Sequence, residues 1–266
     1  MKRVWGHVFA GVGVLAGLGI AGAVVSACVH NDSTIFVSDV LAPQFVTPGM
    51  TCLFTADPTQ PVLSAGTLDA DLTPEYEAEF LVGNQMVPRG DPNQPQTETS
   101  YVTIQGAVVR IVDPLGNQLN TYTWPTSGTI PPSSGTSPGY APIAVTILDS
   151  TTVASLGLTP TYKGGDIKRL VSYVRFFGNS VGGQSVESDE FSFPVNVCRS
   201  CLISFDNQNP DLPEPNCAGT STTATMATSV PCIGGQDFAL SCQNCKGISA
   251  CQGALSGMTI VDAGTD

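Results

Sequence analysis

Residues 75–82 read EYEAEFLV, and this stretch decides the class of fold. Apolar and acidic side chains alternate strictly along it. The apolar set is Tyr76, Ala78, Phe80 and Val82, and the acidic set is Glu75, Glu77 and Glu79. Successive side chains of a β-strand point to opposite faces, so the alternation predicts a strand with one buried face. We expect the glutamate face to be solvated and to discourage pairing with other strand edges.

Further short stretches of apolar character recur along the chain, separated by turn residues: 34–41, 101–113, 118–124, 142–148, 169–177 and 188–197. Within 101–113 the apolar phase shifts at Gly106, which predicts a β-bulge or a bend. The segment 113–117 (DPLGN) is a turn sequence, so the stretches on either side of it form a predicted hairpin.

Two segments break this rhythm. Residues 125–141 (PTSGTIPPSSGTSPGYA) are rich in proline, glycine and serine, which predicts a long loop. Residues 150–158 (STTVASLGL) alone have a pattern typical of a helical turn, with Ser150 as the expected cap.

About seven short strands and almost no helix predict a mainly β protein, an antiparallel immunoglobulin-like β-sandwich. The Cys…Trp…Cys hallmark of antibody domains is missing, so the pattern predicts the architecture and not that family. Composition divides the chain into a leader (1–27), a tether with the first strand (28–65), the β-sandwich domain (66–197) and a Cys-rich, loop-rich tail (198–266).

The leader begins with Lys2 and Arg3 and continues as an apolar run from Val8 to Val25, which is typical of a secretory signal. The run ends in Val25-Ser26-Ala27-Cys28. This sequence resembles the lipobox of bacterial lipoproteins. An uncleaved membrane anchor is the alternative, because the run has about the length that spans a bilayer.

The resemblance implies that diacylglycerol is attached to the Cys28 sulfur, that the chain is cleaved before Cys28, and that the new N-terminus is acylated. Val29 follows the cysteine in place of the aspartate that tends to retain such proteins at the inner membrane. In a Gram-negative cell this implies the outer membrane. Stable attachment to a membrane needs more than one acyl chain, and the mature lipoprotein type carries three.

The net charge of the whole chain is −12, and no acid lies in residues 1–27. Removal of Lys2 and Arg3 with the leader therefore makes it −14. Such an acidic chain has no basic patch to neutralise phosphates, so we predict no nucleic-acid partner. The predicted partners are the membrane, through the lipid anchor, and an envelope protein or glycan.

The chain has nine cysteines, an odd number that needs an explanation. Lipidation of Cys28 leaves an even set: Cys52, Cys198, Cys201, Cys217, Cys232, Cys242, Cys245 and Cys251. An exported protein meets an oxidising space, so we predict four structural disulfides of unspecified connectivity. Cys52 stands alone upstream, so complete pairing requires one bridge from the N-terminal region to the tail.

The two C-x-x-C pairs, Cys198/Cys201 and Cys242/Cys245, leave two alternatives open. They have the spacing of a zinc site, although 40 residues separate the pairs and four further cysteines surround them. A thioredoxin-like redox role would need a C-x-x-C at the start of a helix in a βαβ unit. We predict structural bridges, with no metal and no cofactor.

The sequence contains few residues of the types that common catalytic sites require. The histidines are His7 and His30 alone, which removes Ser-His-Asp and Cys-His catalysis and histidine-ligated metals from residues 31–266. No S-x-x-K motif or P-loop is present, and the pairs Gly182-Gly183 and Gly234-Gly235 read as turns. Paired carboxylates remain, but Glu75, Glu77 and Glu79 share one strand face, whereas a glycosidase needs two that converge on a bond from opposite sides.

Two acidic segments are candidates for calcium, with polar turns as the other interpretation: Asp69-Ala70-Asp71 with Glu75, and 206–211 (DNQNPD). Aromatic residues flank or lie within the long loop at Tyr101, Tyr122, Trp124 and Tyr140. They are candidates for contacts with a carbohydrate or peptide, or for packing.

These features predict a lipid-anchored, non-catalytic envelope protein with a binding or structural role. A hydrolase of glycans that uses carboxylates only is an alternative, and two carboxylates across one cleft would support it. A solute-binding lipoprotein of a transporter is a third possibility, but that class has two α/β lobes, and the sequence shows little helix.

Overall fold

The computed structural model describes residues 33–46, 51–90, 98–206, 208–219 and 232–257. The described residues from Ser33 onward belong to one compact unit. The predicted signal sequence, the segment that resembles a lipobox, Cys28 and His30 lie outside the described residues. Among the residues that are described, no helix has the length and apolar character needed to cross a membrane.

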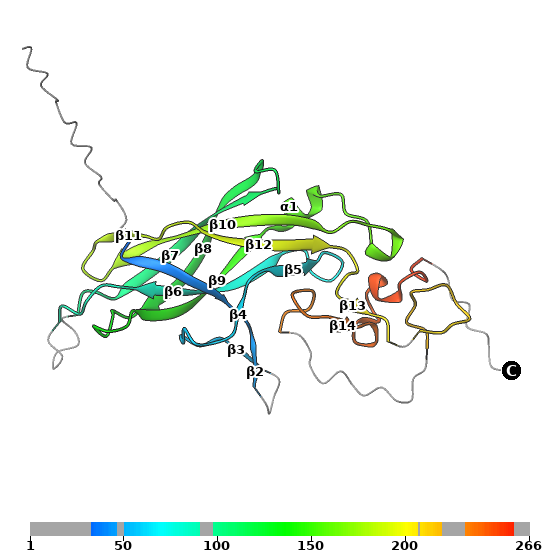
Figure 1. Cartoon of the computed structure of the whole chain (residues 1–266), viewed down its shortest axis with the longest axis horizontal. Coiled ribbons are helices and arrows are strands. Elements are labelled where there is room, and N and C mark those ends of the chain that lie inside the picture. Colours follow the sequence, from blue (N-terminus) through cyan, green and yellow to red (C-terminus); the bar gives the residue numbers. More distant parts are fainter. Residues whose placement is uncertain (1–32, 47–50, 91–97, 207, 220–231, 258–266) are drawn as a thin grey trace, which may run out of the picture. The chain divides into compact units, whose positions relative to one another are not determined.

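In the part of the chain that the structure describes, 45% of residues lie in strands and 9% in helices, so the fold is mainly β. Two sheets dominate (Figure 1). The four-stranded sheet has the order β4 (Val62–Leu63), β1 (Ile35–Leu41), β6 (Tyr76–Asn84) and β9 (Gly139–Leu148). The six-stranded sheet has the order β5 (Gly66–Asp69), β12 (Phe191–Cys198), β10 (Lys168–Ser180), β7 (Val102–Val112) and β8 (Gln118–Ile130), with β11 (Ser185–Glu187) paired to β10.

The remaining elements are short. Two pairs of strands form small ribbons: β2 (Gln44–Val46) with β3 (Thr51–Leu53), and β13 (Ile203–Ser204) with β14 (Leu240–Ser241). Among the described residues, the helices are α1 (Ser150–Ser155) and the 3-10 turns η2 (Thr161–Lys163), η3 (Cys242–Cys245) and η4 (Ser249–Gln252). Pairing is antiparallel throughout the named strands except for β5 with β12 and β13 with β14, which are parallel.

The alternation in β6 has the predicted effect, because Tyr76, Ala78, Phe80 and Val82 are buried in the core that the two main sheets share. The Phe80 ring lies edge-on to Phe176 of β10 at 5.5 Å and to Phe191 of β12 at 6.0 Å, measured between centroids. Burial of one such side chain contributes about 1.5–3 kcal/mol. The contacts of Phe80 therefore join the two sheets.

The phase shift at Gly106 is a β-bulge. The pairing register of β7 shifts between Ile104 and Gly106 against both β8 and β10. The Phe177 ring lies so close that a Cβ atom at Gly106 would meet its Cζ atom at 2.6 Å. Glycine is needed here for this close approach.

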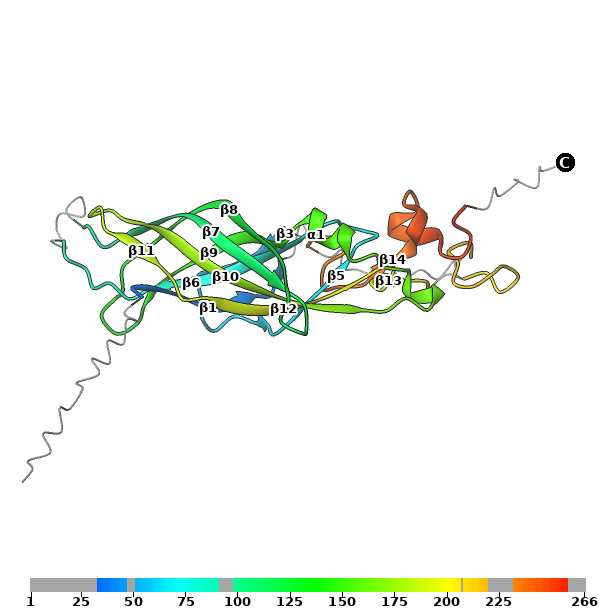
Figure 2. The ribbon, with the colours of Figure 1, turned by 90° about the horizontal axis from the view of Figure 1, so that it is seen from above.

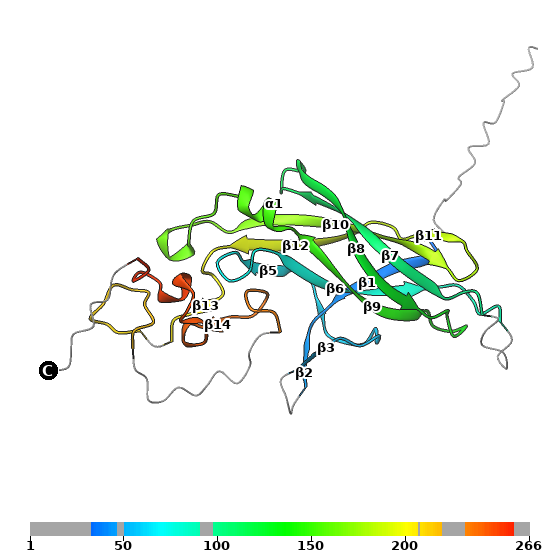
Figure 3. The same ribbon diagram turned by 180° about the vertical axis from the view of Figure 1, so that it is seen from behind.

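The long loop predicted for 125–141 is wrong at both ends. Strand β8 continues to Ile130 and β9 begins at Gly139. Thr126 donates a hydrogen bond from its hydroxyl to the Ala144 carbonyl (2.8 Å), and a Cβ atom at Gly128 would meet Ile143 at 2.0 Å. β8 is an edge strand, where a proline is tolerated, and it runs beside β9 (Figure 3).

The helical turn at 150–158 is present but shorter, and its cap is Asp149 rather than Ser150. The Asp149 carboxylate accepts from the Thr152 N–H (3.4 Å) and from the hydroxyls of Thr151 and Thr152. A carboxylate satisfies several N-terminal donors at once, which a single hydroxyl cannot do.

The strands define two ends of the fold. Ile35, Asn84 and Gly139 lie in one row of the four-stranded sheet, at what we call the Asn84 end. Tyr76 and Leu148 pair at the opposite end of that sheet, the Tyr76 end. The tail beyond Cys198 joins the molecule beside β5, as two views show (Figures 1 and 2).

The domain boundaries at residues 65 and 197 stay predictions, since they concern which segments fold as separate units. Strand β1, which we placed in the tether segment, pairs with β6 and contributes Ile35 and Val40 to the shared core. Residues from Ser33 onward belong to one compact unit.

Candidate functional site: the junction of sheet and tail

The chemistry-bearing side chains gather where the tail meets the sheets. Asp69, the last residue of β5, is fully buried and accepts backbone hydrogen bonds from Ser200 (2.8 Å), Leu202 (2.9 Å) and Asp71 (3.1 Å). Burial raises the pKa of Asp69, although the three N–H groups lower it in part. We call Asp69, Asp71, Arg199, Ser200 and Leu202 the Asp69 junction.

Asp71 supplies the second carboxylate of the Asp69 junction. Its Oδ1 atom lies 2.6 Å from Arg199 Nη2 and 2.8 Å from Arg199 Nε, and its Oδ2 atom accepts from the Ser200 hydroxyl (2.6 Å). The third guanidinium nitrogen of Arg199 donates to the Leu158 carbonyl (3.3 Å). Both acids of the first calcium candidate are thus engaged in holding the start of the tail, and Glu75 is exposed.

The loop 232–238 of the tail pairs with the free edge of β5. Asp237 exchanges two hydrogen bonds with the Thr67 backbone, accepting at Oδ1 (2.8 Å) and donating its own N–H (2.9 Å). Its Oδ2 atom accepts from the Tyr76 hydroxyl (2.8 Å). Burial raises the pKa of both Asp237 and Tyr76. Gly235 has φ +90°, and a Cβ atom there would meet Leu72 at 2.7 Å, so the loop requires glycine at that position.

The structure brings all eight cysteines after Cys28 into disulfide pairs: Cys52–Cys232, Cys198–Cys201, Cys217–Cys242 and Cys245–Cys251. Their Cα–Cα distances are 5.6, 6.0, 5.9 and 5.8 Å in that order, within the usual range for a disulfide. Cys52–Cys232 is the bridge between the upstream region and the tail. Neither C-x-x-C pair meets the other at a zinc site, and no group of three metal-ligating side chains occurs in the described part of the chain.

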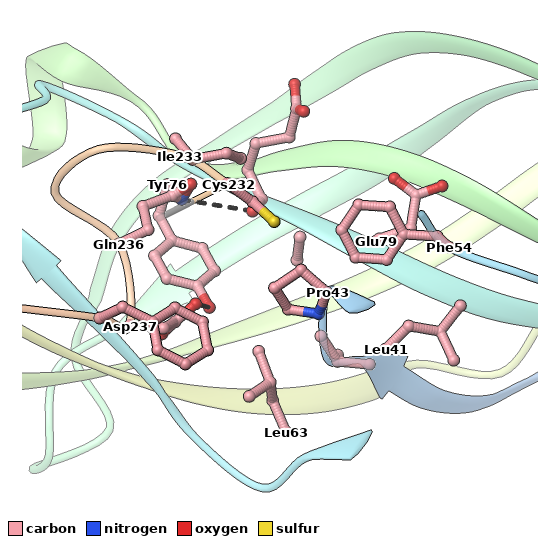
Figure 4. A pocket seen from close by; sticks show the side chains of 14 residues that line it. Leu41, Pro43, Phe54, Leu63, Tyr76, Glu79, Cys232, Ile233, Gln236 and Asp237 are labelled. Atoms are coloured by element: carbon pink, nitrogen blue, oxygen red, sulfur yellow. Dashed lines mark hydrogen bonds between the residues drawn. The ribbon is translucent and has the colours of Figure 1, made fainter. Parts of the chain in front are cut away.

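A pocket lies between the four-stranded sheet and loop 232–238 (Figure 4). Its volume is about 30 Å³, room for one or two water molecules. Most of its wall is apolar, and its polar members come from β6 and the tail. The lining residues are Val40, Leu41, Pro43, Phe54, Leu63, Tyr76, Glu77, Ala78, Glu79, Cys232, Ile233, Gln236, Asp237 and Phe238.

Glu79 is the unusual acid of this pocket, which we call the Glu79 pocket. Burial, with a smaller effect of the Glu77 charge, raises the pKa of Glu79 to about 7. Figure 4 shows Glu79 and Asp237 on opposite sides of the pocket. The expectation of a solvated face holds for Glu75 and Glu77, which are exposed, and is wrong for the half-buried Glu79.

Gln236 fixes the tail side of the Glu79 pocket. Its side-chain amide donates to the Glu77 carbonyl (3.3 Å), while its Oε1 atom is buried without a hydrogen-bond partner. That oxygen has almost no accessible surface, so a molecule in the pocket does not reach it. Gln236 therefore positions the loop rather than offering an acceptor to a ligand.

A larger hollow of about 330 Å³ lies beside α1, and we call it the α1 hollow. Its wall is formed mostly by small and apolar residues, together with Ser150 and Arg199. Its lining residues are Ala70, Pro74, Ser150, Val153, Ala154, Gly157, Leu158 and Arg199. This volume reaches the lower limit of typical small-molecule sites.

The other candidates from the sequence have structural contacts. Tyr122 and Trp124 of β8 pack against the core, and Tyr122 donates to the Thr146 carbonyl (2.9 Å). Tyr140 lies edge-on to Phe36 at 6.1 Å, whereas Tyr101 is exposed.

In the second calcium candidate, residue 207 lies outside the described residues. The Ser204 hydroxyl donates to Asp206, and Asn209 accepts from the Asp211 N–H (3.0 Å). The buried Asn216 accepts from the Asn209 N–H (2.9 Å). These contacts are those of polar turns.

Sequence reasoning missed Asp237, Gln236 and Arg199. Asp237 and Gln236 directly follow Gly234-Gly235, a pair that we interpreted as a simple turn. The signal was a glycine pair between Cys232 and an aspartate, which indicates a tight loop beside a disulfide. Arg199 lies between the two cysteines of a C-x-x-C motif, and we interpreted that motif through its cysteines alone.

Comparisons with protein-family models, with curated proteins and with solved structures find no match to this chain. We therefore infer the function from the residues of this chain and their geometry.

Proposed function

We propose that this chain is a lipid-anchored protein of the bacterial envelope, attached through Cys28, with a non-catalytic binding or structural role. The pairing of the eight cysteines after Cys28 is the observation that carries the proposal. Disulfides persist in exported proteins and are rare in the cytosol. With eight of nine cysteines paired, Cys28 alone is left for another chemistry, and it follows the lipobox sequence.

For the body of the protein we propose an immunoglobulin-like β-sandwich. Two largely antiparallel sheets that share one apolar core support this architecture. We propose the outer membrane of a Gram-negative cell as its location, on the basis of Val29 after the lipidated cysteine.

A binding role is favoured over catalysis by the sizes of the hollows. The hydrolase alternative would use Glu79 and Asp237, which line one pocket. That pocket is far smaller than the 300–1,000 Å³ of small-molecule sites, and both Asp237 oxygens already accept hydrogen bonds. A solute-binding lipoprotein with two α/β lobes fits a mainly β chain poorly.

Mass spectrometry of the protein from membrane fractions, digested without reduction, tests the anchor and the bridges together. We expect an acylated N-terminal Cys28 peptide and four linked cysteine pairs. A Cys28→Ser variant should leave the membrane fraction. Recovery of unmodified residues 1–27 on the protein, or of free thiols with bound zinc, would refute the proposal.

A pull-down from envelope extracts tests the binding role. Ala154 is exposed and lines the α1 hollow, so Ala154→Arg fills the hollow without disturbing the core. We expect this variant to lose a protein or glycan that the parent captures. The control is Ser134→Arg, an exposed position on the β8–β9 turn. Equal capture by both variants would show that the α1 hollow is not the binding surface.

A further inference from the structure

We propose that the Asn84 end of the fold rests on the lipid surface through an apolar patch formed by Val87, Tyr101 and Val181. This inference rests on the proposed lipidation of Cys28. It adds an orientation to that proposal: the disulfide-rich tail is presented away from the membrane.

The described part of the chain begins at Ser33, close to β1. Ser33 lies two residues before β1, whose first pair is Ile35 with Asn84. Figures 1 and 2 both show β1 starting at the end of the fold that carries the turn between β10 and β11. The anchor therefore joins the body at the Asn84 end.

The second step is the length of the tether. Cys28 and Ser33 are five residues apart, because 33 minus 28 is five. An extended chain spans at most about 3.6 Å per residue, so the tether reaches about 18 Å. The acyl chains would hold Cys28 at the membrane surface. A tether of this length therefore keeps the Asn84 end close to the lipid headgroups.

The third step is that neighbouring loops at this end expose apolar side chains. Val87 is 59% exposed, Val181 61% and Tyr101 38%. The Val181 N–H donates to the Tyr101 carbonyl (2.8 Å), and the hydroxyl of Ser100 donates to the Val87 carbonyl (2.8 Å). The β6–β7 connection, which holds Val87 and Tyr101, and the β10–β11 turn, which holds Val181, thus meet at this end.

The two sheets are joined at the same end, so the patch has a rigid base. The buried Asn84 side chain donates to the Ser100 carbonyl (2.8 Å), which links β6 to the start of β7. Glu98 accepts from the backbone N–H groups of Arg89, Gly90 and Ser100. Tyrosine is enriched at membrane–water interfaces. The two exposed valines beside it add apolar surface that lipid can cover.

The occupant is a lipid surface rather than a protein because of the tether. A partner protein would have to enter a gap of about 18 Å or less between this end and the membrane. Scattered exposed apolar residues are ordinary on soluble proteins, and the tether is what gives this group its significance.

The chain offers a matched control at the other end of one strand. Val181 follows the last residue of β10, and Ile167 precedes its first residue. Their exposed fractions are 61% and 57%. Thirteen residues of strand separate them, about 40 Å at 3.3 Å per residue.

The experiment uses the full lipidated protein reconstituted in phosphatidylethanolamine/phosphatidylglycerol vesicles. A fluorophore is attached at Val181→Cys in one sample and at Ile167→Cys in the other, and spin-labelled lipids quench it. We expect at least fivefold stronger quenching at position 181. Equal quenching at both positions, or none at 181, would overturn the inference, because the body would then lie flat or stand away.

A second variant measures the patch directly. Val87→Ser with Val181→Ser should increase the rate of transfer between vesicles about tenfold, whereas Ile167→Ser should leave the rate unchanged. An unchanged rate for the double variant would contradict a lipid contact. Concentration-dependent quenching that reports on a second copy would also contradict it.

The failure of this inference is distinguishable from that of the proposed function. Protein without acyl groups on Cys28, seen by mass spectrometry, refutes the lipid anchor and the orientation with it. Acylated protein whose Val181 label is not quenched refutes the orientation alone.

Discussion

The body and the tail of this protein are stabilised in different ways. The two main sheets enclose one apolar cluster of 26 buried residues, whereas the tail cluster has five, of which three are the half-cystines Cys242, Cys245 and Cys251. A small segment cannot bury enough apolar surface to offset its loss of conformational entropy, so it needs covalent bridges. The stability of the folded tail therefore depends on its disulfides and on its attachment to the body.

The largest effect should come from the core of the body. Phe80→Ala removes a fully buried ring that contacts rings of two strands in the opposite sheet. We expect a loss of about 3–5 kcal/mol in the free energy of unfolding. Chemical denaturation followed by tryptophan fluorescence measures it, since Trp124 packs against the same core.

The matched change in the tail is Leu255→Ala, at a residue with 5% exposure. If the comparison is right, this substitution alters the main unfolding transition much less than Phe80→Ala does. Equal losses would show that body and tail unfold as one unit and would break the distinction.

The next effect concerns the long-range bridge. Cys52→Ser with Cys232→Ser removes a link between residues 180 apart in sequence. Loss of a native disulfide costs about 2–5 kcal/mol, and we expect hydrogen exchange to rise in residues 232–257 more than in β6 or β10. Removal of the local pair Cys245–Cys251, six residues apart, is the control and should leave exchange in loop 232–238 unchanged. Uniform deprotection of the body would contradict the assignment of this bridge to the tail.

The buried carboxylate of the Asp69 junction should have an intermediate effect. Asp69→Asn keeps the shape but offers one acceptor oxygen, and its amide group faces backbone N–H donors. We expect a loss of about 1–3 kcal/mol because buried donors lose their partner. Thermal unfolding measures this loss. Asp206→Asn, at an exposed acid of the tail, is the matched control and should change stability little.

The sequence could predict the strands of the body because their side chains alternate, as in β6. It could not predict the end of β8, since Pro125 and Gly128 have loop composition, and only their position on an edge strand beside Ile143 explains them. The parity of the cysteines predicted a bridge from Cys52 to the tail, but no sequence rule selects Cys232 among the seven tail cysteines.

The candidate site was harder to predict because its contacts span the chain. The backbone N–H groups that Asp69 accepts from lie 131 and 133 residues further on. Glu77 and Glu79 occupy equivalent positions in the alternation, yet Glu77 is exposed and Glu79 is half-buried. What distinguishes it is burial at the Glu79 pocket, to which Phe54 and loop 232–238 contribute, and this is a tertiary effect that alternation cannot reveal.

The smallest effect should be the most specific, because it depends on body and tail together. The pKa of Glu79 is about 7 in the folded protein and near 4.5 without burial. The folded state therefore binds the proton more tightly, so stability falls as pH rises from about 4.5 to 7 and stays lower above that range. Glu79→Gln removes this titration, and we expect a Tm increase of about 2 °C or less at pH 8 and none at pH 4, measured by calorimetry. Glu75→Gln, at an exposed acid on the same strand face, is the matched control. The same Glu79→Gln substitution is then made in a protein that already carries Cys52→Ser and Cys232→Ser. If loop 232–238 buries Glu79, release of the loop from its disulfide lowers the pKa of Glu79. The gain in Tm at pH 8 is then abolished. A gain that persists without the bridge would place the burial in the body alone.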